Sequence, residues 1–581
     1  MSHDHIAIAW RRLAELGWLS LRPSAGIDTA GTALPRSPLT PGEGPGVRAV
    51  AERDASNVPH PNPSPGGRGA PGRYEHLSRD QLVRLLERRD AERQLGLVWE
   101  RPGDGVEADA AVNHDFVALE FDAALSHGDA PYRNLIIEGD NYDALRYLRM
   151  THAGKIRCIY IDPPYNTGNR DFVYNDRFVD KSHRFRHSLW LEFMYRRLTL
   201  ARDLLADDGV IFVSIDDNEL FRLGMLMDRV FGEDNFIDNV IWQKVYSPKN
   251  TAQHFSDDHE YVVVFARNRS LWRPNPLPRS EAQDGAYTNR DSDPRGPWKP
   301  SDLSARNFYG AGTYPITCPS GRVISAPPSG MYWRVSKEKL AELDADKRIW
   351  WGRDGNNVPA LKRFLSEVKQ GVVPQTLWTY GEVGHTQDAK KQLLDVLQFE
   401  SSGDVFSTPK PVQLMERILR IATKPEDTVL DFFAGSGTTA QAVAKLNGED
   451  GGNRRFILVS STERTDDAPD KNLCRDVCAE RVRRVMRGYT NAKGVEVGGL
   501  GGDFAYSRAR RVPRHRLARR LGHAEIWNAL QLLHDLPLLP ELAVRLVLRD
   551  DSGRALAYLP EWHEADVQHL REWCAAHAGR G

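Results

Sequence analysis

The sequence predicts an α/β fold whose central sheet is mostly parallel, with helices on its faces. Apolar runs of strand length alternate with helical patterns over much of the 581-residue chain. Two of these runs stop abruptly, one at a proline pair near residue 163 and one at a glycine-rich turn near residue 435. Because ligands bind at the carboxyl edge of parallel sheets, we expect the functional groups at the ends of these two strands.

Length and composition indicate a globular protein of several domains. A chain of 581 residues is too long for one ordinary domain, and a content of 27% charged and 40% hydrophobic residues is typical of soluble proteins. The net charge of -1 excludes a chain that is basic throughout. Contact with a nucleic acid would therefore depend on local basic patches.

The cysteines and the N-terminus predict a cytoplasmic protein. The five cysteines are scattered and odd in number, which favours a reducing compartment over a disulfide framework. Cys474 and Cys478 could share a metal ion, but no second pair of ligands accompanies them, so we expect no metal site. No apolar stretch approaches membrane-spanning length, and we expect no membrane partner.

The N-terminal part divides into three predicted segments. Residues 1–21 carry apolar positions at helical spacing and predict a short helix. Residues 22–73 are crowded with Pro, Gly, Ser and Arg and cannot bury a core, so they predict a disordered insert. Ser78 caps a helix that has Gln81 in its third position, and from there we predict a helical region within residues 74–130.

The α/β pattern occupies two stretches that a different segment separates. Residues 131–235 and 406–490 carry the alternating strands and helices, and we expect them to form one sheet. Residues 236–405 lose the alternation, are rich in Trp, Gly, Asn and Arg, and predict an inserted domain. Residues 491–581 form a C-terminal region. The predicted strands are 132–137, 158–161, 209–215, 428–431 and 455–459, the predicted helices include 142–150, 190–206 and 527–533, a basic run covers 508–520, and a hairpin turns at 551–553.

The first strand end offers two hydrogen-bond acceptors beside an aromatic ring. Pro163 and Pro164 cannot continue a sheet, because proline lacks an N–H donor and has a fixed φ. The chain must therefore leave the strand at Asp162, with Tyr165 just beyond the turn. The Asp162 carboxylate and the Pro163 carbonyl suit a flat guest that carries an NH2 group. A simple turn without function is the alternative interpretation.

The second strand end has the order of a nucleotide-binding turn. The strand ends at Asp431, and a turn containing Gly435 and Gly437 leads into a helix. Glycines let the backbone approach a ligand, and the helix N-terminus supplies free N–H donors. The lysine of a phosphate-binding P-loop is absent from this turn. The glycine pair alone is a weak signal.

Together the two strand ends resemble the catalytic and S-adenosylmethionine motifs of the β class of DNA amino-methyltransferases. In that class the Asp-Pro-Pro-Tyr motif comes first, a target-recognition domain follows, and the cofactor motif comes last, which is the order found here. The pieces Gly139–Asn141, Ser214–Glu219, Thr408–Pro411 and Glu87–Arg93 are further similar to the modification subunits of type III restriction-modification systems. The resemblance implies a Rossmann-like, S-adenosylmethionine-dependent methyltransferase with its target-recognition domain in residues 236–405.

The resemblance also implies which residues act. It gives catalytic roles to Asp162, Pro163, Pro164 and Tyr165, and cofactor-binding roles to Asp431, Phe433, Gly435, Gly437, Thr438, Asp140, Lys410 and Ser461. For Lys410 a cap or surface role stays equally open. Glu463 is an alternative to Ser461 for the cofactor ribose, because no acidic residue directly follows the strand at 455–459.

The expected reaction is methylation of adenine N6 in double-stranded DNA, without a metal ion. Adenine is favoured because Asp162 heads the motif, where similar cytosine-N4 enzymes mostly carry Ser. Cytosine-N4 methylation, an inactive DNA-recognition module, and methylation of RNA or of a protein glutamine are the alternatives. As partners we expect a second copy of the chain in a homodimer and a separate restriction endonuclease or helicase subunit.

Overall fold

The computed structural model divides the chain into two units, residues 1–96 and 97–581. It describes residues 78–79, 81–84, 115–168, 173–174, 177–178, 185–369, 371–399, 408–464, 470–540, 547–551, 554–560 and 563–576. In the first unit the expected capping box is present, because the Ser78 amide donates to Gln81 Oε1 at 2.8 Å and the Gln81 amide donates to Ser78 Oγ at 3.3 Å. The predicted helix at 1–21 and the predicted insert at 22–73 lie outside the described residues.

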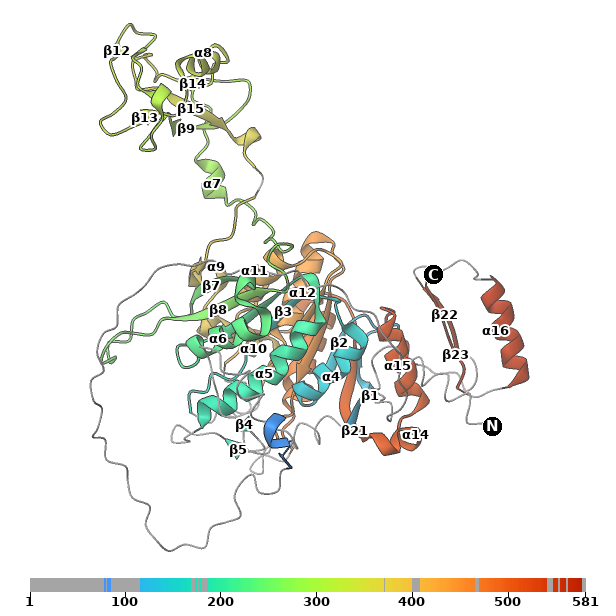
Figure 1. The fold of residues 1–581 in the computed structure, drawn as a ribbon. Coiled ribbons are helices and arrows are strands. Elements are labelled where there is room, and N and C mark those ends of the chain that lie inside the picture. The colour runs from blue at the N-terminus through green and yellow to red at the C-terminus, as the bar shows by residue number, and fades with distance from the viewer. Residues whose placement is uncertain are drawn as a thin grey trace, which may run out of the picture. The chain divides into compact units, whose positions relative to one another are not determined.

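A ten-stranded sheet forms the centre of the second unit, in the order β1-β21-β2-β18-β17-β3-β6-β8-β7-β16 (Figure 1). The run from β21 to β6 is parallel, which confirms the predicted sheet, and β8 is antiparallel to both of its neighbours. The bounds are β1 (Asp115–His127), β2 (Leu135–Glu138), β3 (Ile156–Ile161), β6 (Leu205–Ile215), β7 (Phe236–Gln243), β8 (His259–Ala266), β16 (Leu377–Trp378), β17 (Thr428–Asp431), β18 (Arg455–Ser460) and β21 (Phe504–Pro513).

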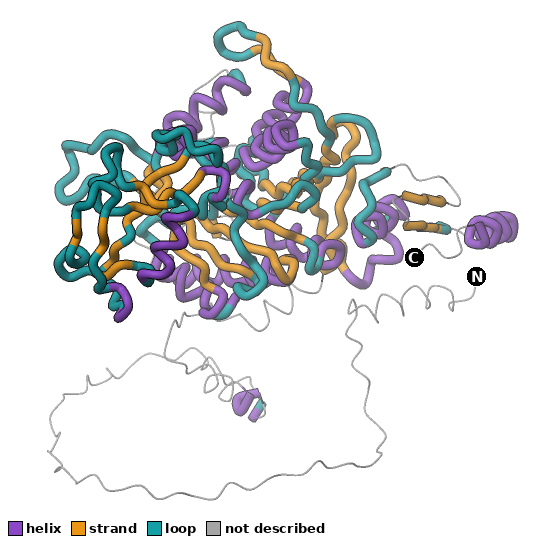
Figure 2. Tube along the Cα trace, turned by 90° about the horizontal axis from the view of Figure 1, so that it is seen from above, coloured by secondary structure: helices purple, strands orange, loops and turns teal. Residues whose placement is uncertain are grey.

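Helices cover both faces of this sheet (Figure 2). Side chains alternate along β3, so that Ile159 and Ile161 pack with α4 (Asn141–His152), α5 (Arg186–Leu204) and α6 (Leu220–Phe231). Cys158 and Tyr160 face the opposite side, where they pack with α11 (Val412–Ala422), α12 (Thr438–Asp450) and α13 (Glu480–Arg487). A strand that is buried on both faces has to be apolar throughout, which is why the sequence shows β3 as one continuous run.

The remaining elements are short or lie outside the sheet. They include β4 (Val173–Tyr174), β5 (Arg177–Phe178), β19 (Gly488–Thr490), β20 (Glu496–Gly498), β22 (Val547–Asp551), β23 (Arg554–Tyr558), α9 (Tyr380–Val383), α10 (Thr386–Val396), a π-helix (Cys474–Ala479), α14 (Leu517–Arg520), α15 (His523–Leu533) and α16 (Glu564–Ala576). The β22–β23 pairing confirms the hairpin predicted near residue 552. Among the described residues, no helix combines the length and apolar character needed to cross a membrane.

The range 236–405 is not a separate domain over its whole length. Both of its ends belong to the central sheet, since β7 and β8 pair with each other, β8 pairs with β6, and β16 pairs with β7. Val240 and Trp242 of β7 and Val262 of β8 are buried in the main core. The predicted sheet region stopped at residue 235, before β7 and β8, because the prediction relied on strands alternating with helices. β7 and β8 form an antiparallel pair, and no helix separates them.

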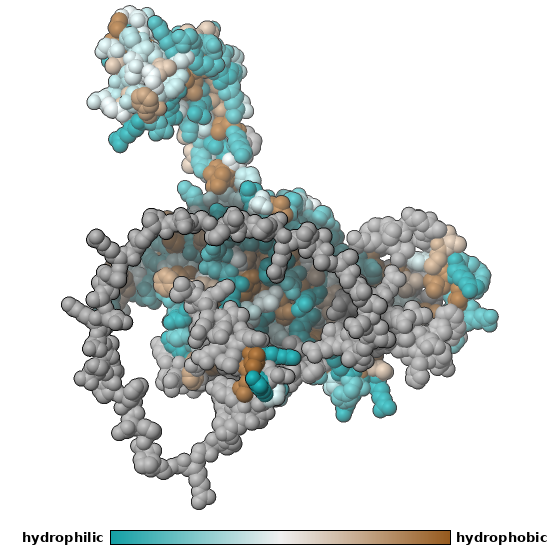
Figure 3. Space-filling model, viewed as in Figure 1, coloured by the Kyte–Doolittle hydropathy of each residue, from teal (hydrophilic) through white to brown (hydrophobic). Residues whose placement is uncertain are grey.

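A smaller module occupies residues 277–372, between β8 and β16. Its ends meet at Leu277 and Val372, whose backbones exchange two hydrogen bonds of 2.8 Å. It has its own apolar cluster, which contains Leu303, Trp333 and Leu340. The face of this module that Figure 3 shows is mainly hydrophilic with scattered hydrophobic residues. The elements are α7 (Glu281–Gly285), β9 (Trp298–Asp302), β10 (Ser304–Ala305), β11 (Ile316–Thr317), β12 (Val323–Ile324), β13 (Tyr332–Trp333), α8 (Lys337–Ala345), β14 (Ile349–Trp350) and β15 (Ala360–Phe364).

Two strands come from segments that were not expected to enter the sheet. β1 is a 13-residue strand within the region predicted to be helical, and β21 places part of the C-terminal region between β1 and β2. The basic run begins in β21. Its Arg508 pairs with Asp122 at 2.7 Å and its Arg511 pairs with Asp143 at 2.5 Å, so these two arginines already have carboxylate partners within the fold.

Candidate active site

The Asp-Pro-Pro-Tyr turn leaves β3 at the carboxyl edge of the sheet and is anchored at two further points. The Pro164 carbonyl accepts a hydrogen bond from the indole of Trp190 on α5 at 2.7 Å. Asn166 adopts a left-handed φ of 57°, is fully buried, and donates to Glu219 at 2.5 Å. Glu219 is itself fully buried at the N-cap of α6. These contacts hold the turn in one conformation, so that Asp162 has a defined position.

The Asp162 carboxylate has a separate partner on each oxygen. Lys410 Nζ, which comes from the segment just before α11, donates to Oδ2 at 2.6 Å. The Tyr165 hydroxyl lies 2.9 Å from Oδ1. Burial raises the pKa of Asp162 above its ordinary value, while the Lys410 ammonium opposes that rise. The side chain is still 21% exposed, so a ligand can reach it.

Glu260 on β8 completes this cluster, although the sequence analysis did not select it. Its carboxylate lies 3.0 Å from the Tyr165 hydroxyl, 3.1 Å from Lys244 Nζ and 3.7 Å from Lys410 Nζ. The two carboxylates and two ammonium groups therefore alternate in charge, and the Tyr165 hydroxyl contacts both carboxylates. The sequence feature that could have indicated Glu260 is its position, with His259, directly before an apolar run of strand length. That run lies in the segment that was not expected to form part of the sheet.

The Tyr165 hydroxyl can donate to only one carboxylate at a time, because it carries a single proton. Burial, Asp162 and Glu260 together raise the pKa of Tyr165 well above its ordinary value, so the phenol stays neutral. Lys410 Nζ lies 5.1 Å from the centre of the ring and contributes a cation–π contact. The ring is partly buried and is held beside Asp162 rather than turned away from it.

The Asp431 side chain is hydrogen-bonded to residues of the glycine-rich loop and of the helix that follows it. Its Oδ2 accepts a hydrogen bond from Thr439 Oγ1 at 2.6 Å, and its Oδ1 accepts one from the Phe433 amide at 3.1 Å. The side chain is buried, and this burial raises the pKa of Asp431 to about 7. β17 pairs with β3, and so the loop emerges next to the Asp162 turn.

The two glycines of this loop have left-handed backbones, with φ of 48° at Gly435 and 77° at Gly437. Gly437 is the N-cap of α12, and a Cβ there would lie 3.1 Å from the carbonyl oxygen of Cys478. Arg481 supports the loop from below, since its Nη1 donates to Thr438 Oγ1 at 2.7 Å and to Ser436 Oγ at 3.0 Å. Burial lowers the pKa of Arg481 to about 10. Arg481 is a second residue whose contribution the sequence analysis missed.

The other residues expected at the cofactor lie along the same sheet edge. Asp140 follows β2, caps α4 by accepting from the amides of Tyr142 and Asp143, and pairs with Arg197 at 3.0 Å. Its side chain is 47% exposed and so remains accessible. Phe433 is partly buried, with its ring centre 6.0 Å from that of Phe193. The last of these residues is Ser461, which is exposed directly after β18.

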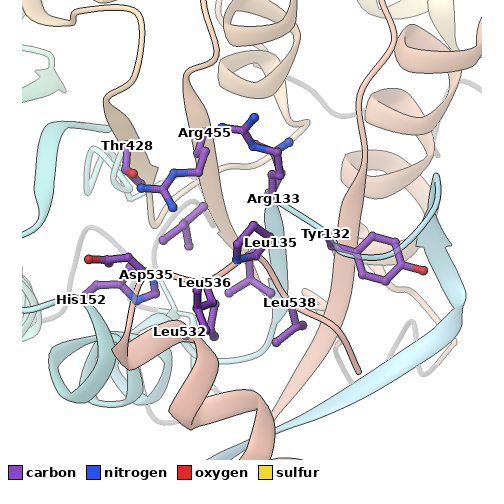
Figure 4. A pocket seen from close by; sticks show the side chains of 13 residues that line it. Tyr132, Arg133, Leu135, His152, Thr428, Arg455, Leu532, Asp535, Leu536 and Leu538 are labelled. Carbon is purple, nitrogen blue, oxygen red and sulfur yellow. The ribbon is translucent and has the colours of Figure 1, made fainter. Parts of the chain in front are cut away.

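A small cavity lies at the opposite edge of the sheet, where β2, β17 and β18 begin (Figure 4). Its volume is about 30 Å³, which is the space of one water molecule. It is lined by Tyr132, Arg133, Asn134, Leu135, His152, Thr428, Arg455, Ile457, Leu532, Asp535, Leu536, Pro537 and Leu538. This cavity is too small for a nucleoside. Within the part of the chain that the structure describes, no three potential protein ligands gather as a metal site would require.

A family model described as DNA methylase matches residues 156–464. The match includes both the Asp162 turn and the glycine-rich loop, and it spans more than half of the 581 residues. The chain belongs to the DNA methylase family.

Individual proteins and solved structures resemble the chain to different extents. The Mod subunit of the type III restriction-modification enzyme StyLTI from Salmonella typhimurium is 36% identical over 381 residues, 61% of this chain and 57% of that protein. The type II methyltransferase M.KpnI from Klebsiella pneumoniae is 32% identical, over 56% of this chain and 79% of that protein. The solved PvuII DNA methyltransferase (cytosine-N4-specific) is 14% identical with a TM-score of 0.30, over 61% of this chain and 88% of that chain. The chain therefore spans only 57% of the length of the StyLTI subunit that it matches.

Proposed function

We propose that this chain transfers a methyl group from S-adenosylmethionine to adenine N6 in double-stranded DNA. The observation that carries the proposal is the neighbouring position of two strand ends. β3 presents the Asp162 carboxylate, and the adjacent β17 presents the glycine-rich loop at the same edge. An acceptor for an amine thus lies beside a loop whose backbone is suited to a nucleoside cofactor.

The residues at this edge fit S-adenosylmethionine. The left-handed glycines Gly435 and Gly437 expose backbone at the start of α12, a 13-residue helix, and the helix N-terminus favours the carboxylate of the cofactor. The exposed Asp140 carboxylate can reach the positively charged groups of the cofactor, and the exposed Ser461 can reach the ribose of the cofactor. The bound cofactor would supply an electrophilic methyl group on a sulfonium. Phe433 and Thr438 complete the proposed binding set.

Asp162 and the Pro163 carbonyl act on the amine. The lone pair of an exocyclic amine is conjugated with the ring, and two acceptors that hold its N–H bonds help the nitrogen to become tetrahedral. As the N–C bond forms and the S–C bond breaks, positive charge develops on this nitrogen, and the nearby carboxylate stabilises it. Asp162 has a raised pKa and so is also a better acceptor for the proton that the methylated amine releases.

Tyr165 and Lys410 act through position rather than through bond changes. The Tyr165 ring beside Asp162 offers a stacking surface for a base that has left the duplex, a movement that costs a few kcal/mol. Lys410 touches the Asp162 carboxylate directly. We therefore propose that it orients and neutralises that carboxylate, in place of the cofactor contact expected from the sequence. Pro164 fixes the turn by accepting the Trp190 hydrogen bond.

The biological setting is also a proposal. Three relatives that are 29–36% identical, the Mod subunits of the type III restriction-modification enzymes StyLTI, EcoPI and EcoP15I, support a modification subunit of a type III-like restriction-modification system. In such a setting residues 277–372 would read the DNA sequence, a second copy of the chain would complete a dimer, and a separate subunit would cut. Cytosine N4 is the second candidate target, because its amine makes the same demands on Asp162.

The test is a methylation assay on unmodified genomic DNA with isotopically labelled S-adenosylmethionine. After digestion to nucleosides, mass spectrometry should find the label in N6-methyladenine, at one sequence context. The Asp162→Ala protein serves as the blank, and we expect its rate to fall by about 100-fold or more, with cofactor affinity nearly unchanged. Label in N4-methylcytosine would establish the second candidate, and unlabelled DNA would refute DNA methylation.

A further inference from the structure

The loop that joins β7 to β8, residues 244–258, starts and ends beside the proposed active site. β7 is parallel to β6 because both are antiparallel to β8, and so β7 ends at the same sheet edge as β3 and Asp162. The two ends of the loop are joined, since the Lys244 amide donates to the Asp258 carbonyl at 2.8 Å. Lys244 Nζ also contacts Glu260 at 3.1 Å. The loop is thus a direct extension of the site.

Phe255 is the unusual feature of this loop. Its side chain is 91% exposed, the highest value among the large hydrophobic side chains in the described ranges. An exposed phenyl ring contributes none of the favourable free energy that burial of apolar surface would provide, and contacts with neighbouring polar residues do not replace that contribution. Single exposed apolar residues are common on protein surfaces. The position of this one, on a loop that begins and ends at the catalytic edge, points to a ligand that covers it.

The same loop has groups that suit a nucleic acid. Lys249 and His254 are exposed near Phe255. The loop also has internal order, because the Lys249 amide donates to Ser256 Oγ at 2.8 Å and the Ala252 amide donates to the Lys249 carbonyl at 3.0 Å. A positively charged side chain next to an exposed aromatic ring is the pairing that binds a phosphate backbone and stacks on a base.

We propose that Phe255 enters the DNA base stack at the place left by the flipped target base, while Lys249 contacts the phosphate backbone. The inference rests on the proposed function and adds a residue on the DNA side of the same site. Flipping breaks the stacking of the target base on both of its neighbours. A phenyl ring in the gap replaces part of that stacking, as apolar wedges do between base steps in other complexes.

The first experiment measures binding and needs neither methylation nor a known recognition sequence. Two fluorescent duplexes share one sequence, and one of them contains a single abasic site, which offers a ready gap. We expect the full chain to bind the abasic duplex about 10-fold more tightly, and the Phe255→Ala variant to lose this preference. Phe255→Leu keeps an apolar wedge and should keep part of it. Leu271→Ala, which truncates an apolar side chain that is 55% exposed, is the control and should bind as wild type, because Leu271 follows the end of β8 at the sheet edge opposite Asp162.

The second experiment uses single-turnover methylation at the mapped target. On a matched duplex, Phe255→Ala should lower the rate by about 10- to 100-fold, the effect expected from losing one base–aromatic stack. On a duplex with a mismatch at the target base, which flips more easily, its rate should approach that of wild type. S-adenosylmethionine affinity should not change.

The two experiments separate the inference from the proposed function. If the wild-type protein methylates no DNA but shows a Phe255-dependent preference for the abasic duplex, the proposed function is overturned, whereas insertion of Phe255 into the base stack is supported. Normal methylation by wild type with an equal rate for Phe255→Ala, or with the same defect on matched and mismatched DNA, would overturn the wedge. A wild-type chain that shows no preference for the abasic duplex would also overturn it. A ring that instead docks a protein would produce this last result.

Discussion

Lys410 Nζ lies 2.6 Å from Asp162 Oδ2, although the two residues are 248 positions apart in the chain. The contact joins the end of β3 to the segment that precedes α11. It places an ammonium group against a carboxylate whose pKa is raised by burial. Both side chains are mostly buried, with 9% of Lys410 and 21% of Asp162 exposed. The strength of this pair therefore decides the pH range in which Asp162 is ionised.

Lys410→Met should move the acid limb of the pH–rate profile to higher pH. The substitution keeps the length of the side chain but removes the charge and the hydrogen bond that lower the Asp162 pKa. A reaction that needs ionised Asp162 loses rate as the pH falls through that pKa, and the loss should begin at higher pH in the variant. The measurement is kcat against pH for both proteins. Superimposable acid limbs would show that Lys410 does not control Asp162.

Glu260→Gln should move the same limb in the opposite direction. The Glu260 carboxylate raises the Asp162 pKa, and the amide removes that charge while keeping an acceptor for the Tyr165 hydroxyl. Asp162 should then stay ionised to lower pH. Each variant serves as a control for the other. Loss of packing would shift both pH–rate profiles in the same direction, whereas shifts in opposite directions require an electrostatic cause. A shift of the Glu260→Gln limb to higher pH would contradict the assignment.

Gly437→Ala should weaken both the fold and cofactor binding. The left-handed φ of 77° is strained for alanine by about 1–2 kcal/mol, and its Cβ would also meet the Cys478 carbonyl at 3.1 Å. Gly494→Ala is the matched control, because Gly494 has the same φ of 77° with no atom within 4 Å of the new Cβ. Thermal unfolding should register both variants, and calorimetric titration with S-adenosylmethionine should register Gly437→Ala alone. Equal cofactor affinity in the two variants would place the cofactor elsewhere.

Asp431→Asn should flatten the pH dependence of stability between about pH 4 and 7. Burial raises the folded-state pKa of Asp431 to about 7, above the ordinary aspartate value of about 3.9. Within this window the folded state holds more protons than the unfolded state. The free energy of unfolding therefore decreases as the pH rises, by at most about 1.4 kcal/mol per pH unit from this group.

Chemical denaturation at several pH values measures this effect. Asparagine is close in shape to aspartate and can still accept from the Phe433 amide, so the loop should keep its form. The difference between the wild-type and Asp431→Asn free energies of unfolding should grow in favour of the variant as the pH rises from 4 to 7. Parallel curves across this window would show that Asp431 has an ordinary pKa in the folded protein.

The sequence alone determined the features that depend on local covalent geometry. Pro163 and Pro164 must end a strand, because proline lacks the N–H that a sheet requires. The strand, Gly435-x-Gly437 and following helix were likewise evident, since left-handed turns select glycine. The strand β3 and the helix α15 also appeared as expected, because a strand buried on both faces and an amphipathic helix have apolar patterns that need no tertiary information.

Only the tertiary structure decided which distant residues meet at the site and which strands form the sheet. Glu260, Lys410 and Lys244 come from three separate segments, and no local pattern links them to Asp162. β1 pairs with β21, which comes from the far end of the chain, whereas β7 and β8 are neighbours in the chain that form an antiparallel pair. The first pairing is nonlocal, and the second lacks the helix between strands that marks a parallel unit. Strand pairing is decided by burial and hydrogen bonding between segments that fold together, a nonlocal energy that the order of residues along one segment does not express.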